Sequence, residues 1–230
     1  MQFGIQFFPV ESTATSAGAD YWANALSIVD EIDDLGFSSV RAVEHYFHRY
    51  GGYSPNPLAF FCAAAQRTNC LLYTSPLKLA SEIAFCDAIS QGRLEVGFAR
   101  AFLPHEFERF GVPLDESRSR FEEALAIVAR LLVEENVAHE GRHWRFPATT
   151  IFPRPTQKPR PPFWVAAIQS TESFVNAGRA GHGVMAIPLA GETMRELIAT
   201  YRKAWREAGH PGNGRVMIAF HMYCSPSAAE

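Results

Sequence analysis

Acidic, imidazole and aromatic side chains are concentrated in one short stretch, VEHYFHRYGGYSPNP, at residues 43–57. In this stretch Glu44 stands next to His45, and a turn rich in Gly, Ser and Pro closes it. A histidine titrates near neutral pH and can carry a proton to or from a reacting group. The stretch therefore predicts a reactive site where a strand ends and a loop begins.

A second set of polar residues suits an anionic ligand. Arg100 offers a guanidinium group that can hold a phosphate with two hydrogen bonds. After Gln169, Ser170 and Ser173 open a predicted helix, whose first backbone N–H groups attract anions, although Ser170 is equally a natural N-cap. The sequence has no Walker loop, and HEFERF (105–110) lacks the second histidine of a zinc motif. We expect a phosphate-bearing organic cofactor and no metal site.

The same residues also have purely structural explanations. His45 can be a hydrogen-bonded structural histidine, and Glu44 can bridge to a neighbouring strand. Arg100 can form a surface ion pair with Glu106 or Glu108, a contact that contributes little to stability. The sequence alone leaves both explanations open at each position.

The elements that must position these residues alternate between strand and helix. Short apolar runs predict strands at 3–9, 39–46, 69–75, 93–100, 163–168, 183–189 and 215–223. Apolar residues at three- and four-residue spacing, with caps and terminal glycines, predict helices at 20–35, 55–68, 76–92, 115–135, 170–181 and 190–209. Residues 137–162 predict a hairpin followed by a proline-rich excursion. This order indicates a parallel sheet covered by helices.

Two architectures fit that order, a (β/α)8 barrel and an open doubly wound sheet. The first predicted strand leads into ESTATSAG rather than the Gly-x-Gly-x-x-Gly of a dinucleotide-binding fold, which favours the barrel. In a barrel, catalytic residues lie in the loops after the carboxyl ends of the strands. Glu44, His45, Arg100, Gln169 and Ser170 all follow predicted strands, so we expect them at one rim.

Composition and charge narrow the choice of partners and of compartment. The 230 residues suit one large domain, and the net charge of -3 without a basic stripe argues against nucleic acid. The N-terminus lacks the features of a signal peptide, and LAFFCAAA, the longest apolar run, is too short to cross a bilayer. The four cysteines form no CxxC pair. We expect a cytoplasmic protein without a membrane partner.

Several longer stretches are similar to one family. VEHYF followed by SPNP, and then SEIAFCDAISQGRLEVGFARAFLPHEFERFGV, resemble the bacterial luciferase-like monooxygenases. The second stretch is the more specific, with Ser-x-Gly-Arg, a strand, an arginine near its end and a Phe-Gly turn. SRSRFEEALAIVARLL and the stretch ending in PRPPFWVAAIQSTES are similar too, so that the resemblance runs in order from residue 3 to about 225.

This resemblance implies a fold, a cofactor and roles for the residues above. The family is a (β/α)8 barrel that holds reduced FMN or, in a sister branch, the deazaflavin F420, and EHYF with SPNP is closer to the flavin-using branch. His45 matches a histidine implied in acid–base handling at the flavin, and Glu44 matches a residue that lines the flavin site. Arg100 matches the arginine that meets the flavin phosphate. Three further residues match the family's stretch after the fifth strand, which contacts the cofactor: Gln169, Ser170 and Ser173.

The implied function is a flavin-dependent monooxygenase that uses O2 and reduced FMN from a separate flavin reductase to oxidise a small organic, aldehyde-like substrate. An F420-dependent oxidoreductase and a non-catalytic flavin-binding member are the alternatives, and a homodimer is one option for assembly. Compared with the family, the third strand is short and the eighth strand is missing. We therefore expect residues 1–230 to form a single barrel domain that is incomplete and truncated at its C-terminus.

Overall fold

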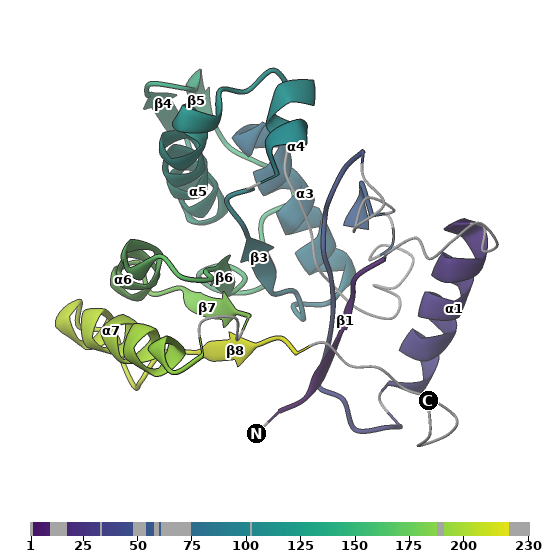
Figure 1. Ribbon diagram of the computed structural model, residues 1–230. Helices are drawn as coiled ribbons and strands as arrows, with labels where there is room; N and C mark the ends of the chain where they lie inside the picture. The colour runs from purple at the N-terminus through teal and green to yellow at the C-terminus, as the bar shows by residue number, and fades with distance from the viewer. Residues whose placement is uncertain are drawn as a thin grey trace. The chain divides into compact units, whose positions relative to one another are not determined.

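The computed structural model of the chain describes residues 2–9, 18–32, 34–47, 54–57, 60, 75–101, 103–187 and 191–220. The chain divides into two compact units, Met1–Pro162 and Phe163–Glu230, whose helices and strands are labelled in Figure 1. Each unit has buried apolar side chains of its own. Among the described helices, none is both long enough and apolar enough to span a lipid bilayer.

The first unit begins with a strand–helix–strand segment formed by β1 (Gly4–Phe7), α1 (Gly18–Glu31) and β2 (Ser39–Ala42). The two strands pair in parallel, in a register that sets Gly4 opposite Ser39. Helix and strands bury one apolar cluster, made of Phe7, Ala25, Val29, Ile32, Val40 and Phe60. This cluster fixes the end of β2, from which the chain continues into the stretch that contains Glu44 and His45.

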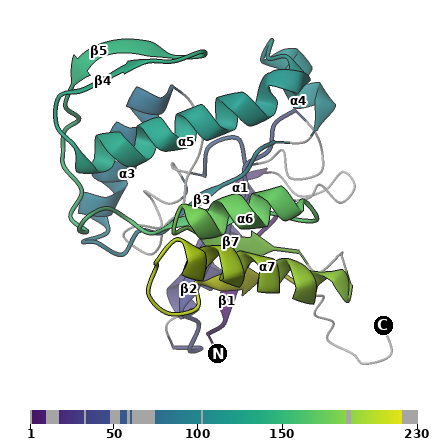
Figure 2. The ribbon, with the colours of Figure 1, turned by 90° about the vertical axis from the view of Figure 1, so that its left-hand side faces the viewer.

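The rest of the first unit is built around two packed helices, α3 and α5. The face that α5 buries consists of Ala124, Ile127, Val128, Leu131 and Leu132, at the spacing of an amphipathic helix. An antiparallel hairpin of β4 and β5 lies beside α5 (Figure 2). The elements are α3 (Pro76–Ile89), β3 (Val96–Phe98), α4 (Pro104–Arg109), the 3₁₀ turn η1 (Leu114–Glu116), α5 (Ser117–Val133), β4 (Val137–Glu140) and β5 (Arg145–Thr149).

The proline-rich excursion after the hairpin is tied back to α3. The Asp87 carboxylate is fully buried and accepts hydrogen bonds from the backbone N–H and the side-chain amide of Gln157, both at 2.8 Å. The same amide donates to the carbonyl oxygen of Leu94 at 2.7 Å. These three bonds hold the excursion in the first unit.

The second unit is a three-stranded parallel sheet covered by two helices. Its elements are β6 (Phe163–Ala166), α6 (Thr171–Arg179), β7 (Gly183–Ala186), α7 (Thr193–Glu207) and β8 (Val216–Ile218). Within this unit β7 pairs with both β6 and β8, and α6 and α7 lie side by side over the sheet (Figures 1 and 2). The buried Tyr201 hydroxyl donates to the His182 carbonyl at 2.9 Å and accepts from the Arg215 N–H at 3.0 Å. These bonds connect α7 to the residues that directly precede β7 and β8.

The predicted alternation of parallel strands and helices is confirmed, whereas the predicted barrel is confirmed only as an α/β fold. The strands of the described residues do not form a closed barrel. Of the predicted third strand, 69–75, all but Ser75 lies outside the described residues, as does most of the predicted helix at 55–68. The organisation of 1–230 as one truncated domain stays a prediction.

The observed strands are shorter than the predicted ones. The strand expected at 39–46 ends at Ala42, because the backbone of Tyr46 bonds to α4 instead of to a neighbouring strand. The helix expected at 115–135 begins at Ser117, after η1. The six-residue helix α4 was absent from the predicted elements, since it is too short to show an apolar period.

Candidate active site

Two short segments of the first unit build the candidate site. The chain leaves β2 at Ala42 and runs through Glu44, His45 and Tyr46. Helix α4 begins at Pro104, and proline suits the first turn of a helix because it lacks an N–H group that would otherwise be unsatisfied. The helix thereby carries His105 and Glu106 in its first turn, and both side chains bond to the segment after β2.

The Glu106 carboxylate is the centre of this contact. Its Oε1 atom lies 3.3 Å from Nδ1 of His45 and accepts the backbone N–H of Tyr46 at 2.9 Å. The side chains of His45 and Glu106 are 14% and 7% exposed, so water screens the pair weakly. The backbone N–H of Tyr46 can only donate, so Oε1 of Glu106 is its acceptor, and the same oxygen faces Nδ1 of His45.

Both backbone polar groups of Tyr46 bond to side chains of α4. Its N–H donates to Glu106, and its carbonyl oxygen lies 3.2 Å from Nε2 of His105. A carbonyl oxygen only accepts, so His105 donates from Nε2. Helix α4 thus satisfies two backbone groups that the strand ladder of β2 no longer satisfies, and this fixes the position of His45.

Glu44 differs sharply from its neighbour. Both of its carboxyl oxygens are buried, and neither makes a hydrogen bond with the described residues. Burial, reinforced by the nearby charge of Glu106, raises the pKa of Glu44 to about 10. At neutral pH Glu44 is therefore an uncharged carboxylic acid with one hydrogen-bond donor and a free acceptor.

Aromatic rings lie next to the His45–Tyr46 segment. The rings of Tyr46, Phe47 and Phe110 contact one another with centroid distances between 5.0 and 5.7 Å. Phe8 approaches the His45 imidazole at 5.8 Å. Phe47 has a φ of 56° and is 55% exposed, an unfavourable backbone conformation for a bulky residue. An apolar surface therefore adjoins the acid–base residues.

Arg100 is placed by a different helix. Its Nη1 donates to the Ser117 hydroxyl at 3.1 Å, at the beginning of α5. The ion pair with Glu106 that the sequence offered as an alternative is not formed, because Glu106 is buried against His45 and Tyr46. Arg100 itself is exposed, with its guanidinium accessible to an anion.

The remaining predicted residues belong to the second unit, around the beginning of α6. Ser170 is the N-cap of this helix, as predicted, and its hydroxyl accepts the backbone N–H of Ser173 at 3.4 Å. Gln169 is exposed, and Ser170 and Ser173 are half-buried. The cap explains Ser170 structurally, and a role of these three residues in cofactor binding stays a prediction.

The sequence arguments missed His105 and Glu106. Glu106 was considered only as a surface partner of Arg100, and HEFERF only as a failed metal motif. A signal was nevertheless present: Pro104 marks the start of a helix, and an acid–imidazole pair in its first turn follows the Arg100 strand directly. What the sequence could not supply is the approach of residues 60 positions apart.

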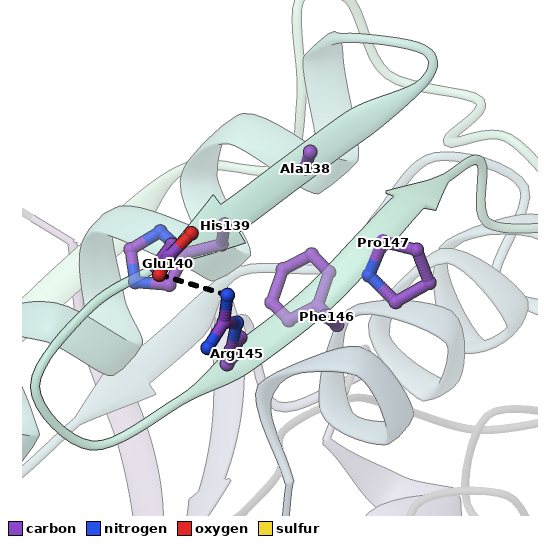
Figure 3. A pocket seen from close by; sticks show the side chains of 6 residues that line it. All are labelled: Ala138, His139, Glu140, Arg145, Phe146 and Pro147. Carbon is purple, nitrogen blue, oxygen red and sulfur yellow. Dashed lines mark ion pairs between the residues drawn. The ribbon is translucent and has the colours of Figure 1, made fainter.

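A depression elsewhere in the first unit has none of these residues in its wall. It measures about 670 Å³ and lies on the β4–β5 hairpin, where Glu140 and Arg145 form an ion pair of 2.9 Å (Figure 3). Its lining consists of Ala138, His139, Glu140, Arg145, Phe146 and Pro147. Its Glu140–Arg145 ion pair is exposed, and Nε2 of His139 is bonded to the Glu123 carboxylate of α5.

A family model and several known proteins match this chain. The family model described as luciferase-like monooxygenase matches residues 1–230. Uncharacterized protein y4vJ of Sinorhizobium fredii is 31% identical, in an alignment that covers 100% of this chain and 68% of that protein. The oxygenase component of the flavin-dependent trigonelline monooxygenase of Acinetobacter baylyi is 29% identical, over 86% of this chain and 58% of its own length. The chain spans about half to two thirds of the length of the curated relatives it matches.

Solved structures agree with this grouping. Monooxygenase RslO1 from Streptomyces bottropensis is 42% identical with a TM-score of 0.90, and the match covers 97% of this chain and 71% of that one. The oxygenating constituent of 3,6-diketocamphane monooxygenase from Pseudomonas putida, in complex with FMN, has a TM-score of 0.83 at 22% identity and covers 98% and 68%. An F420-dependent secondary alcohol dehydrogenase has a TM-score of 0.77 at 19% identity and covers 95% and 68%. These last two likenesses concern the fold alone.

Proposed function

This chain belongs to the luciferase-like monooxygenase family, and from that premise we propose that it is a flavin-dependent monooxygenase that uses reduced FMN and O2 to oxidise a small organic substrate. The flavin dependence of the trigonelline monooxygenase, a relative over 86% of this chain, supports the choice of cofactor. That relative is named an oxygenase component, which supports a separate reductase as the source of reduced flavin.

The observation that carries the proposal is the pair of buried Glu44 oxygens without hydrogen bonds among the described residues. Buried polar atoms are normally satisfied, so such a pair indicates that another molecule supplies the partners. A neutral carboxylic acid both donates and accepts, and the isoalloxazine ring of a flavin carries carbonyl and N–H groups along one edge. The donor set of Glu44 fits that edge chemically.

The other residues take roles that follow from their own contacts. When bound, reduced FMN supplies the electrons that activate O2. His45, oriented by Glu106, is the group that would hold or move a proton at its Nε2 atom. Arg100 would bind the phosphate group through its guanidinium, and Gln169, Ser170 and Ser173 are the further cofactor-binding residues of the proposal. The rings of Tyr46, Phe47 and Phe110 would shield the reacting groups from water.

A direct test combines binding with the fate of oxygen. Under anaerobic conditions the protein is titrated with reduced FMN and, separately, with reduced F420, and binding is followed by absorbance. The FMN-loaded protein is then mixed with ¹⁸O2 and a panel of aldehydes and ketones, and mass spectrometry measures ¹⁸O in the products. We expect FMN binding and incorporation of one ¹⁸O atom. Binding of F420 in place of FMN would support the F420-dependent alternative, and FMN binding without oxidation of any panel member would support the non-catalytic one.

A further inference from the structure

Glu106 contacts the segment that contains the predicted site residues Glu44 and His45. It reaches His45 through the imidazole Nδ1 and Tyr46 through the backbone N–H, and its charge acts on Glu44. Its side chain is 7% exposed, so this carboxylate contacts the segment after β2 rather than solvent. Burial of a carboxylate lowers stability unless hydrogen bonds compensate for the lost water.

The two acids of this group lie in unequal surroundings. Oε1 of Glu106 accepts the backbone N–H of Tyr46 and faces Nδ1 of His45, whereas the oxygens of Glu44 accept no hydrogen bond from the described residues. Glu106 is therefore placed to accept an imidazole N–H, and Glu44 is the neutral acid.

From this geometry we infer that Glu106 is a positioning residue: it holds His45 in the Nδ1–H tautomer and keeps its Nε2 as the ring nitrogen for proton transfer. The catalytic use of this proton transfer rests on the proposed function. The tautomer of His45 itself can be measured in the protein without its cofactor. A fixed tautomer matters because only the unprotonated nitrogen of a neutral imidazole can accept a proton. Orientation of a catalytic histidine by a buried acid is a general device of acid–base sites.

Nuclear magnetic resonance of the flavin-free protein tests the tautomer directly. The ¹⁵N shifts of the histidine rings report which nitrogen carries the proton, and the His45→Gln variant identifies the His45 signals. We expect the Nδ1–H form in the wild type and in Glu106→Gln, whose amide oxygen can still accept. In Glu106→Ala we expect the two nitrogens to give averaged shifts. Glu108→Ala, which removes an exposed acid from the same helix, should leave the His45 signals unchanged.

Activity of the FMN-loaded variants completes the test. We expect Glu106→Ala to lower kcat by about 10- to 100-fold, less than the loss of a general base itself, with an unchanged Kd for reduced FMN. Nε2–H signals of His45 in the wild type, or identical ring shifts in Glu106→Ala and the wild type, would overturn the inference. Since the ring signals are measured without flavin, a failure of the proposed function would appear in the activity arm alone.

Discussion

At the scale of single residues, Glu44 makes the stability of the fold depend on pH. Burial and the charge of Glu106 raise the pKa of Glu44 from its ordinary value of 4.5 to about 10. Between these values the folded chain keeps a proton on Glu44 that the unfolded chain releases. The free energy of unfolding therefore falls as pH rises through this window, by up to about 1.4 kcal/mol per pH unit from this group.

Replacing Glu44 by glutamine removes that dependence. Because the amide cannot ionise, we expect Glu44→Gln to unfold at higher urea concentrations than the wild type at pH 8, with a much smaller difference at pH 5. Glu135→Gln, at an exposed position, serves as the control and should follow the wild type at both pH values. Equal destabilisation of Glu44→Gln at pH 5 and pH 8 would contradict a raised pKa.

The sequence identified Glu44 and His45 of the candidate site and missed His105 and Glu106. Glu44 and His45 could be found because they are adjacent, follow a predicted strand and match a family stretch. Glu106 could not, because its role depends on a bond to a residue 61 positions away. A charged residue next to an arginine in sequence is more simply explained as a surface pair, and the structure shows that this explanation is wrong for Glu106.

At the scale of elements, one carboxylate attaches the β4–β5 hairpin to α5. Glu123 of α5 accepts hydrogen bonds from Nε2 of His139 at 2.9 Å and from the backbone N–H groups of His143 and Trp144 at 3.0 and 3.1 Å. Burial acts to raise the pKa of Glu123, but the bonds from His139, Trp144 and His143 together lower it. The carboxylate thus stabilises the fold in its ionised form.

The contribution of Glu123 to the free energy of unfolding should change with pH in the opposite direction to that of Glu44. A lowered pKa in the folded state gives stability that is present above the ordinary value and is lost as pH falls through the folded value. We expect Glu123→Gln to lower the free energy of unfolding by about 1–3 kcal/mol at pH 7 and by less at acid pH. Urea unfolding at pH 7 and pH 4 measures the difference, with the exposed Glu122→Gln as control. A loss that is equal at both pH values would exclude a contribution from ionised Glu123.

The two helices of the second unit approach closely at a glycine. A Cβ atom at Gly178 of α6 would lie 2.5 Å from the carbonyl oxygen of Tyr201 in α7. Since that neighbour is backbone, it cannot rotate away, and Gly178→Ala should separate the helices. We expect a loss of about 1–3 kcal/mol, as for overpacked cores, and a lower Tm by circular dichroism. Ala180→Gly at an exposed position just after α6 is the matched control, and an unchanged Tm in Gly178→Ala would show that the helices separate without cost.

Elements could be predicted where local signals are strong. The order of strands and helices, the hairpin after α5 and the Ser170 cap follow from periodicity, turn residues and capping chemistry. The end of β2 was placed too late, because the backbone groups of Tyr46 bond to side chains of α4 rather than to a neighbouring strand. Tertiary contacts decide whether a backbone group bonds to a neighbouring strand or to a helix side chain, and a single sequence does not show these contacts.

At the scale of the whole molecule, closure of a barrel is the feature that local patterns could least decide. Alternating strands and helices predict a parallel sheet, but the same order serves open and closed sheets alike. The family match over residues 1–230 supports the barrel type, while the described strands remain in open sheets. The α/β class of the fold was thus predicted from the sequence, whereas the predicted incompleteness of the barrel stays a prediction.

Cofactor binding should also be visible in the stability of the whole chain, because a ligand that binds only the folded state raises its free energy of unfolding. Under anaerobic conditions, reduced FMN at 100 times its Kd should add about 2.7 kcal/mol. If Arg100 binds the phosphate, Arg100→Ala should weaken FMN binding by about 10- to 100-fold, the loss of a charge-assisted hydrogen bond, and leave the binding of reduced riboflavin unchanged. Arg130→Ala, which removes an exposed arginine of α5, controls for the change in net charge. Equal weakening of FMN and riboflavin in Arg100→Ala would mean that Arg100 acts through its bond to Ser117, and so through the start of α5, rather than on the phosphate.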